Sequence, residues 1–108
     1  MPSSVLSKVE EALNRLGKKL EETCGPVEMY LFGSFARGDW LEDSDIDIIV
    51  VSEKFEGKPM PERVNLVRKL APDNLAFEIL AYTPKELKEA MTKSLIIQDA
   101  SAHWKRII

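Results

Sequence analysis

Residues 30–52 constrain the fold of this chain more than any other stretch, because they join two expected strands through a glycine-serine turn. The apolar run before Gly33 is typical of a strand. A glycine at its end allows a sharp turn and the close approach of a ligand to the backbone. The residues after Ser34 can begin a helical turn whose free N–H groups bind anionic oxygen, and Ser34 adds a hydroxyl donor. The turn is therefore predicted to hold phosphate groups.

Two aspartates open the second expected strand, residues 45–52, which is rich in β-branched residues. Asp45 and Asp47 are two positions apart, so they share one face of a strand. Neighbouring carboxylates repel each other and lose solvation unless a cation lies between them, and oxygen ligands of this kind suit Mg²⁺ or Mn²⁺. A nucleoside triphosphate held by the turn would bring its α-phosphate to such ions, as in-line nucleotidyl transfer requires. Solvent-exposed loop charges are the alternative.

Gly33-Ser34, ten intervening residues and Asp45-x-Asp47 together resemble the signature of the DNA polymerase β-type nucleotidyltransferase superfamily. The longer string GSFARG…SDIDIIV is similar to its small MNT members, which are often paired with HEPN-domain partners in prokaryotic toxin–antitoxin modules. The resemblance implies Mg²⁺-dependent transfer of AMP from ATP to a hydroxyl acceptor with release of pyrophosphate. It also implies a HEPN-type protein partner, with a tyrosine of that partner as a candidate acceptor and this chain as the antitoxin.

Glu78 is the only charge in a third expected strand, residues 75–82. A carboxylate there is costly unless it is paired or binds a metal. The resemblance implies that Glu78 takes the place of the family's third acid, usually Asp, as a ligand of the metal that activates the acceptor. The longer side chain departs from that pattern, and a solvent-facing residue of an edge strand is the alternative. A nucleotidyltransferase fold that acts by contact with a partner, with weak or no catalysis, therefore remains a second hypothesis.

Arg37 follows the turn and either contacts phosphate or pairs with a nearby acid such as Asp39 or Asp43. Residues 43–47 begin like an EF-hand calcium loop, but that loop needs glycine where Ile48 stands. The chain contains no GxxxxGK[ST] pattern, which excludes a P-loop. The turn and the aspartates therefore do not belong to either of these common sites.

The order of the expected elements predicts an α/β fold with a short mixed sheet and helices packed mainly on one face. The resemblance implies the same fold, with residues 1–108 as a single nucleotidyltransferase domain. Thr83 and Glu86 form a predicted capping box at the start of a helix, with Pro84 in its first turn. The other expected elements are helices over residues 5–20, around 64–70 and over 94–108, and a strand over 27–32.

Composition limits the partners and the compartment. A net charge of −3 argues against tight, sequence-independent binding to nucleic acid. A single cysteine, Cys24, allows no internal disulfide, and no apolar run approaches the ~20 residues that span a bilayer, so we expect a cytoplasmic protein. The apolar residues of 94–108 exceed what a three-stranded sheet would bury, which predicts a homodimer or a complex with a helical partner. His103 is expected on the surface, and Trp40 either covers the nucleotide or packs in the core.

Overall fold

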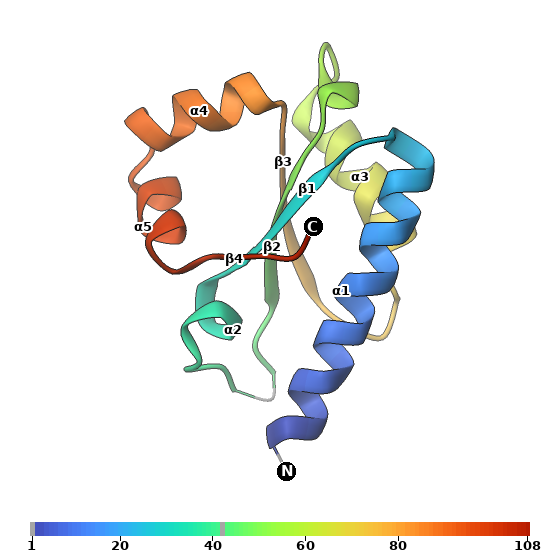
Figure 1. Cartoon of the computed structure of the whole chain (residues 1–108), viewed down its shortest axis with the longest axis vertical. Coiled ribbons are helices and arrows are strands. Elements are labelled where there is room, and N and C mark those ends of the chain that lie inside the picture. Colours follow the sequence, from blue (N-terminus) through green and yellow to red (C-terminus); the bar gives the residue numbers. More distant parts are fainter. Residues whose placement is uncertain (1, 42) are drawn as a thin grey trace.

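The computed structural model describes residues 2–41 and 43–108 (Figure 1). Its helices and strands mostly alternate along the chain. They are α1 (Pro2–Cys24), β1 (Glu28–Phe32), α2 (Gly33–Arg37), β2 (Ile46–Val51), the 3₁₀ helix η1 (Glu53–Phe55), α3 (Met60–Leu70), β3 (Phe77–Tyr82), α4 (Pro84–Lys93), α5 (Leu95–His103) and β4 (Lys105–Arg106).

The strands form one mixed sheet in the order β3-β2-β1-β4. β2 is parallel to β3 and antiparallel to β1, and β4 pairs antiparallel with β1. The predicted α/β fold with a short mixed sheet is confirmed, and β4 is a strand that the sequence pattern did not predict. The last segment is helical only to His103, because the chain then turns back along β1.

Alternation along β2 separates two apolar layers. Ile46, Ile48 and Val50 face a core that α1 and α3 cover, whereas Ile49 and Val51 face a second core with Ile97 of α5. Figure 1 shows α1 and α3 on one side of the sheet and α4 and α5 on the other. The prediction that helices pack mainly on one face is therefore wrong, since α4 and α5 cover the second face.

The amphipathic helix α1 supplies the largest single contribution to the first core. Val9, Leu13, Leu16 and Leu20 recur at helical spacing, and each is at most 1% exposed. Burying each of these side chains is worth roughly 1.5–3 kcal/mol. The helix ends before Gly25, which has a φ of 74° and donates its N–H to Glu21 O.

Most of the apolar C-terminal residues help to close the core. Ile107 donates its N–H to Met29 O at 2.7 Å, and Ile108 Cδ1 lies 3.2 Å from a Cβ built on Gly17 of α1. Ile97 is 1% exposed, and Trp104 stacks on Tyr30 with 4.3 Å between ring centroids. We expected that the sheet could not bury all apolar residues of 94–108, and Leu95 and Ile96 are indeed left 81% and 70% exposed. The other large apolar residues of this segment are covered within the chain, and an interface with a partner stays a prediction.

The predicted capping box at the start of α4 is present. Thr83 Oγ1 accepts the Glu86 N–H at 3.2 Å, and Glu86 Oε1 accepts the Thr83 N–H at 2.8 Å. These two bonds satisfy backbone donors that the first turn of a helix leaves without an intrahelical partner. The direction in which the chain leaves β3 is therefore set locally.

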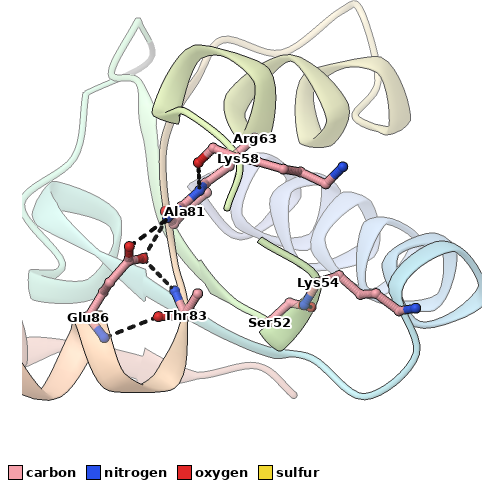
Figure 2. Close-up of polar contacts among 7 residues, drawn as sticks. All are labelled: Ser52, Lys54, Lys58, Arg63, Ala81, Thr83 and Glu86. Atoms are coloured by element: carbon pink, nitrogen blue, oxygen red, sulfur yellow. Dashed lines mark hydrogen bonds and ion pairs between the residues drawn. The ribbon is translucent and has the colours of Figure 1, made fainter. Parts of the chain in front are cut away.

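Arg63 of α3 connects this helix start to the rest of the fold (Figure 2). Its guanidinium donates to both carboxylate oxygens of Glu86, at 2.5 and 3.1 Å, and to the backbone oxygens of Lys58 at 2.7 Å and Ala81 at 3.1 Å. The Arg63 side chain is only 7% exposed, and each of its three guanidinium nitrogens donates at least one hydrogen bond. The interaction joins α3, β3 and α4.

None of the described helices is long and apolar enough to cross a membrane.

Candidate active site

Gly33 lies at the point where β1 passes into α2, and its φ is 70°. The register of β1 and β2 places Phe32 opposite Asp47. A Cβ built on Gly33 would overlap the Asp47 carboxylate, with only 2.9 Å to Asp47 Cγ. Glycine is therefore required twice, by the left-handed backbone and by the neighbouring carboxylate. We expected the glycine to make room for a ligand, and the structure shows that it makes room for Asp47.

α2 is a short helix held in place by its own buried side chains. Phe35 and Ala36 are buried, and the Phe35 ring stacks on Trp40 with centroids 5.2 Å apart. The helix ends at Gly38, which has a φ of 87° and donates its N–H to Ser34 O at 2.9 Å. The N-cap residue Phe32 makes no side-chain hydrogen bond to the helix. Trp40 thus packs under the turn, which was one of its two expected roles.

Arg37 reaches outward from the last turn of α2. Its Nε lies 3.2 Å from Asp39 Oδ2, in a pair whose side chains are 40% and 62% exposed. The structure shows the Asp39 pairing that was one of the two expected roles of Arg37. An ion pair this exposed contributes ~0–1 kcal/mol, so a stronger anion can displace Asp39 at little cost.

Asp47 and Glu78 are direct neighbours on the parallel strands β2 and β3. Asp47 is half-buried, and Glu78 is exposed on the edge strand. The pKa of Asp47 is raised to about 6, first by burial, then by hydrogen bonding with Glu78 and by the charges of Glu78 and Asp45. The Arg37 charge acts in the opposite direction. The fold therefore brings together the acids that the sequence singled out, with Asp45 just before β2.

Crowded carboxyl oxygens of this kind fit a hard divalent cation such as Mg²⁺, since its charge would offset both the burial and the carboxylate repulsion that raise the Asp47 pKa. Within residues 2–41 and 43–108, no three His, Cys, Asp or Glu side chains already converge as a ligand set. The assignment of Asp45, Asp47 and Glu78 as metal ligands stays a prediction. Glu78 is both solvent-exposed and adjacent to Asp47, so its role as the third acid stays a prediction, with a solvent-facing residue as the alternative.

α5 is the part of the site that the sequence did not predict. It lies beside α2, and residues from both helices line one cavity that includes Gly33, Arg37 and His103. His103 is exposed, as expected, but it also lines the same cavity as Gly33 of the turn. No local signal could have shown this, because it depends on how the chain returns over the sheet after β3.

Comparison with known proteins decides the family. The model of the nucleotidyltransferase domain family matches residues 6–103, which include the glycine-serine turn and all three acids. The chain belongs to the nucleotidyltransferase family. This nucleotidyltransferase is 31% identical over 94 residues to a Methanocaldococcus jannaschii protein that is provisionally named a protein adenylyltransferase. The match covers 87% of this chain and 93% of the relative.

A second relative and two solved structures agree. The protein adenylyltransferase MntA of Thermococcus cleftensis is 41% identical over 54 residues, half of this chain and 54% of the relative. A structure provisionally described as a nucleotidyltransferase from Sulfolobus solfataricus matches with a TM-score of 0.67 and 23% identity, over 80% of this chain and 77% of that one. A structure described as a toxin-antitoxin with AMP-PNP matches with a TM-score of 0.62 and 24% identity, over 88% and 72%. These structures support the fold of the nucleotidyltransferase.

Proposed function

We propose that this nucleotidyltransferase transfers AMP from ATP to a hydroxyl group of a partner protein. The observation that carries the proposal is the placement of Gly33 against Asp47, with Glu78 on the next strand. The backbone proposed to bind phosphate and the acids proposed to bind metal therefore share one end of the sheet. The names of the relatives, which are protein adenylyltransferases, support AMP as the group and a protein as the acceptor.

Each residue has a role in this proposal. Gly33 and Ser34 hold the β- and γ-phosphates through backbone N–H groups and a hydroxyl, and Arg37 leaves Asp39 to contact phosphate. Asp45 and Asp47 would hold Mg²⁺ or Mn²⁺, with Glu78 as the acid nearest the acceptor. When bound, the metal supplies positive charge that stabilises the attacking and leaving oxygens.

The acceptor oxygen forms a bond to the α-phosphorus while the bond to pyrophosphate breaks. The acceptor proton passes to Glu78, whose exposure leaves it accessible from the solvent side. Pyrophosphate leaves from the Gly33–Ser34 turn. We expect the acceptor to belong to a HEPN-type protein, which fits the toxin-antitoxin description of one structural neighbour. A homodimer is the alternative assembly, and the cytoplasmic location stays a prediction.

Transfer of label from α-labelled ATP tests the proposal. The purified chain is incubated with Mg²⁺, with and without the protein encoded next to it, and labelled protein and released pyrophosphate are both measured. Label should enter the partner with the wild-type chain and with Asp43→Asn, an exposed acid of the same loop. It should be absent with Asp47→Asn. Nucleotide binding or partner binding without any transfer would instead support the contact-only hypothesis.

A further inference from the structure

A cavity of about 330 Å³ lies between the Gly33 turn and α5. Gly33 and Arg37 line one side, and Leu95, Ile96, Asp99 and His103 of α5 line the other. Ligand pockets of about 300–1,000 Å³ with apolar walls and a few polar groups are typical of small-molecule sites. Because Gly33 belongs to both, the cavity is continuous with the proposed phosphate site.

One stripe of α5 faces this cavity. Ile96, Asp99 and His103 are spaced at i, i+3 and i+7, which places them on one side of a helix. Ile97 on the buried side is 1% exposed, and the Ser94 side chain accepts the Ile97 N–H, so the helix is firmly positioned. The stripe is therefore a fixed wall.

The start of α5 exposes two large apolar side chains. Leu95 is 81% exposed and Ile96 is 70% exposed, although neighbouring Ile97 is buried. Both line the cavity. Covering these exposed apolar side chains with an apolar ligand surface would be favourable, because it removes them from water.

Three parts of the two substrates could occupy this cavity. A phosphate group would be attracted to Arg37 on the turn side, but on the α5 side it would meet apolar side chains and the Asp99 carboxylate, which repels it. The acceptor is expected beside Glu78 on β3, and β2 separates β3 from β1 and its Gly33 turn. In an in-line displacement the attacking and leaving oxygens lie on opposite sides of the phosphorus, so the nucleoside is attached away from that axis. Asp47 lies on the same face of β2 as Ile49, and this is the sheet face that α5 covers. The nucleoside, attached to a phosphate near Asp47, is therefore the part that can extend toward α5.

We propose that this cavity binds the nucleobase of the nucleoside triphosphate, and this inference rests on the proposed function. Leu95 and Ile96 cover one surface of the base, and the Asp99 carboxylate accepts a hydrogen bond from an exocyclic amino group such as that of adenine. His103, one turn further along α5, offers a second hydrogen-bonding group. α5 thus selects the base, whereas the Gly33 turn holds the phosphates common to all nucleoside triphosphates.

Calorimetric titration in Mg²⁺ with ATP and with inorganic tripolyphosphate separates these contributions. The double variant Leu95→Ser/Ile96→Ser should bind ATP about tenfold more weakly than the wild type and tripolyphosphate equally well. Leu41→Ser is the matched control, because Leu41 is 69% exposed and does not line the cavity. Unchanged ATP affinity, or an equal loss for both ligands, would overturn the proposal.

A second titration tests Asp99 with ATP and purine riboside triphosphate, which lacks the exocyclic amine. The wild type should prefer ATP by about tenfold, since a site built to hydrogen-bond an amine rejects the analogue without it. Asp99→Ala should remove that preference, and Asp73→Ala, an exposed acid outside the cavity, should keep it. Equal wild-type binding of both nucleotides refutes the assignment. Binding as expected without any transfer would refute the proposed function alone, because titration does not require catalysis.

Discussion

The ion pair between Arg63 and Glu86 makes the strongest prediction about stability. Arg63→Met replaces the arginine with an unbranched apolar side chain that fills part of the same space. It removes four hydrogen bonds, two to the Glu86 carboxylate and two to backbone oxygens. Removing one partner of a buried pair costs about 3–5 kcal/mol when the remaining charge stays buried. The Glu86 side chain is 39% exposed and keeps its bond to the Thr83 N–H, so it regains solvation. We therefore expect a loss of about 2–3 kcal/mol in the free energy of unfolding at pH 7.

The same pair gives this loss a pH dependence. Hydrogen bonding from Arg63 is the largest cause that lowers the Glu86 pKa from 4.5 to about 2. A depressed carboxyl pKa stabilises the fold above the unfolded pKa, and that contribution disappears as the pH falls from about 4.5 to 2. Each pKa unit corresponds to about 1.4 kcal/mol, and solvent screening of the 39% exposed carboxylate reduces the total to about 1–2 kcal/mol. The difference in free energy of unfolding between the wild type and Arg63→Met should therefore be about 1–2 kcal/mol smaller at low pH than at pH 7.

Urea unfolding followed by circular dichroism between pH 2.5 and 7 measures both effects. Lys58→Met is the matched control, because Lys58 forms an exposed pair with Glu62 at 3.8 Å and its backbone oxygen is unchanged. It should stay within about 0.5 kcal/mol of the wild type at every pH. An Arg63→Met variant as stable as this control would refute the reasoning, and so would a gap that does not change with pH.

The other predictions concern the site. Gly33→Ala should lower the free energy of unfolding by about 2 kcal/mol or more and abolish transfer. The control Gly57→Ala should cost about 1 kcal/mol, because Gly57 has a φ of 78° but nothing lies within 4 Å of the added Cβ. Urea unfolding and transfer from labelled ATP measure the two effects. Asp47→Asn should abolish transfer yet stabilise the metal-free fold at pH 7, because the raised Asp47 pKa means that ionisation destabilises the native state; equal or lower stability, or a stabilisation that persists below pH 3.8, would contradict this. Glu78→Gln should lower the transfer rate much more than the ATP affinity, and an unchanged rate would leave Glu78 as a solvent-facing residue.

Much of the site could be predicted because its signals are local. A glycine at the end of an apolar run predicted the turn, and the spacing of Asp45 and Asp47 predicted a shared strand face. The isolated charge of Glu78 in an apolar strand marked the third acid, which the register places beside Asp47. The Thr83 capping box was also correct, since capping depends on residues three positions apart.

The errors concern elements whose position depends on the whole sheet. Residues 94–108 have an apolar pattern that suits a helix, but pairing with β1 converts residues 105–106 into a strand. The covered residues Ile97 and Ile108 and the exposed Ile96 have the same side-chain chemistry, so their sequence cannot distinguish core from surface. The packing of α5 on the second face of the sheet covers Ile97 and leaves Ile96 exposed, whereas Ile108 packs against α1 and the first core.

The sequence by itself determined the chemistry of this nucleotidyltransferase: the turn, the paired aspartates and the family to which they belong. Short-range backbone preferences and alternation along a strand are sufficient for that. The tertiary structure decided that Asp47 occupies the space beside Gly33, that Arg63 reaches Glu86 across 23 positions, and that α5 lies next to the turn. These contacts join residues from different elements, and their energy depends on distances and burial that exist only once the sheet has formed.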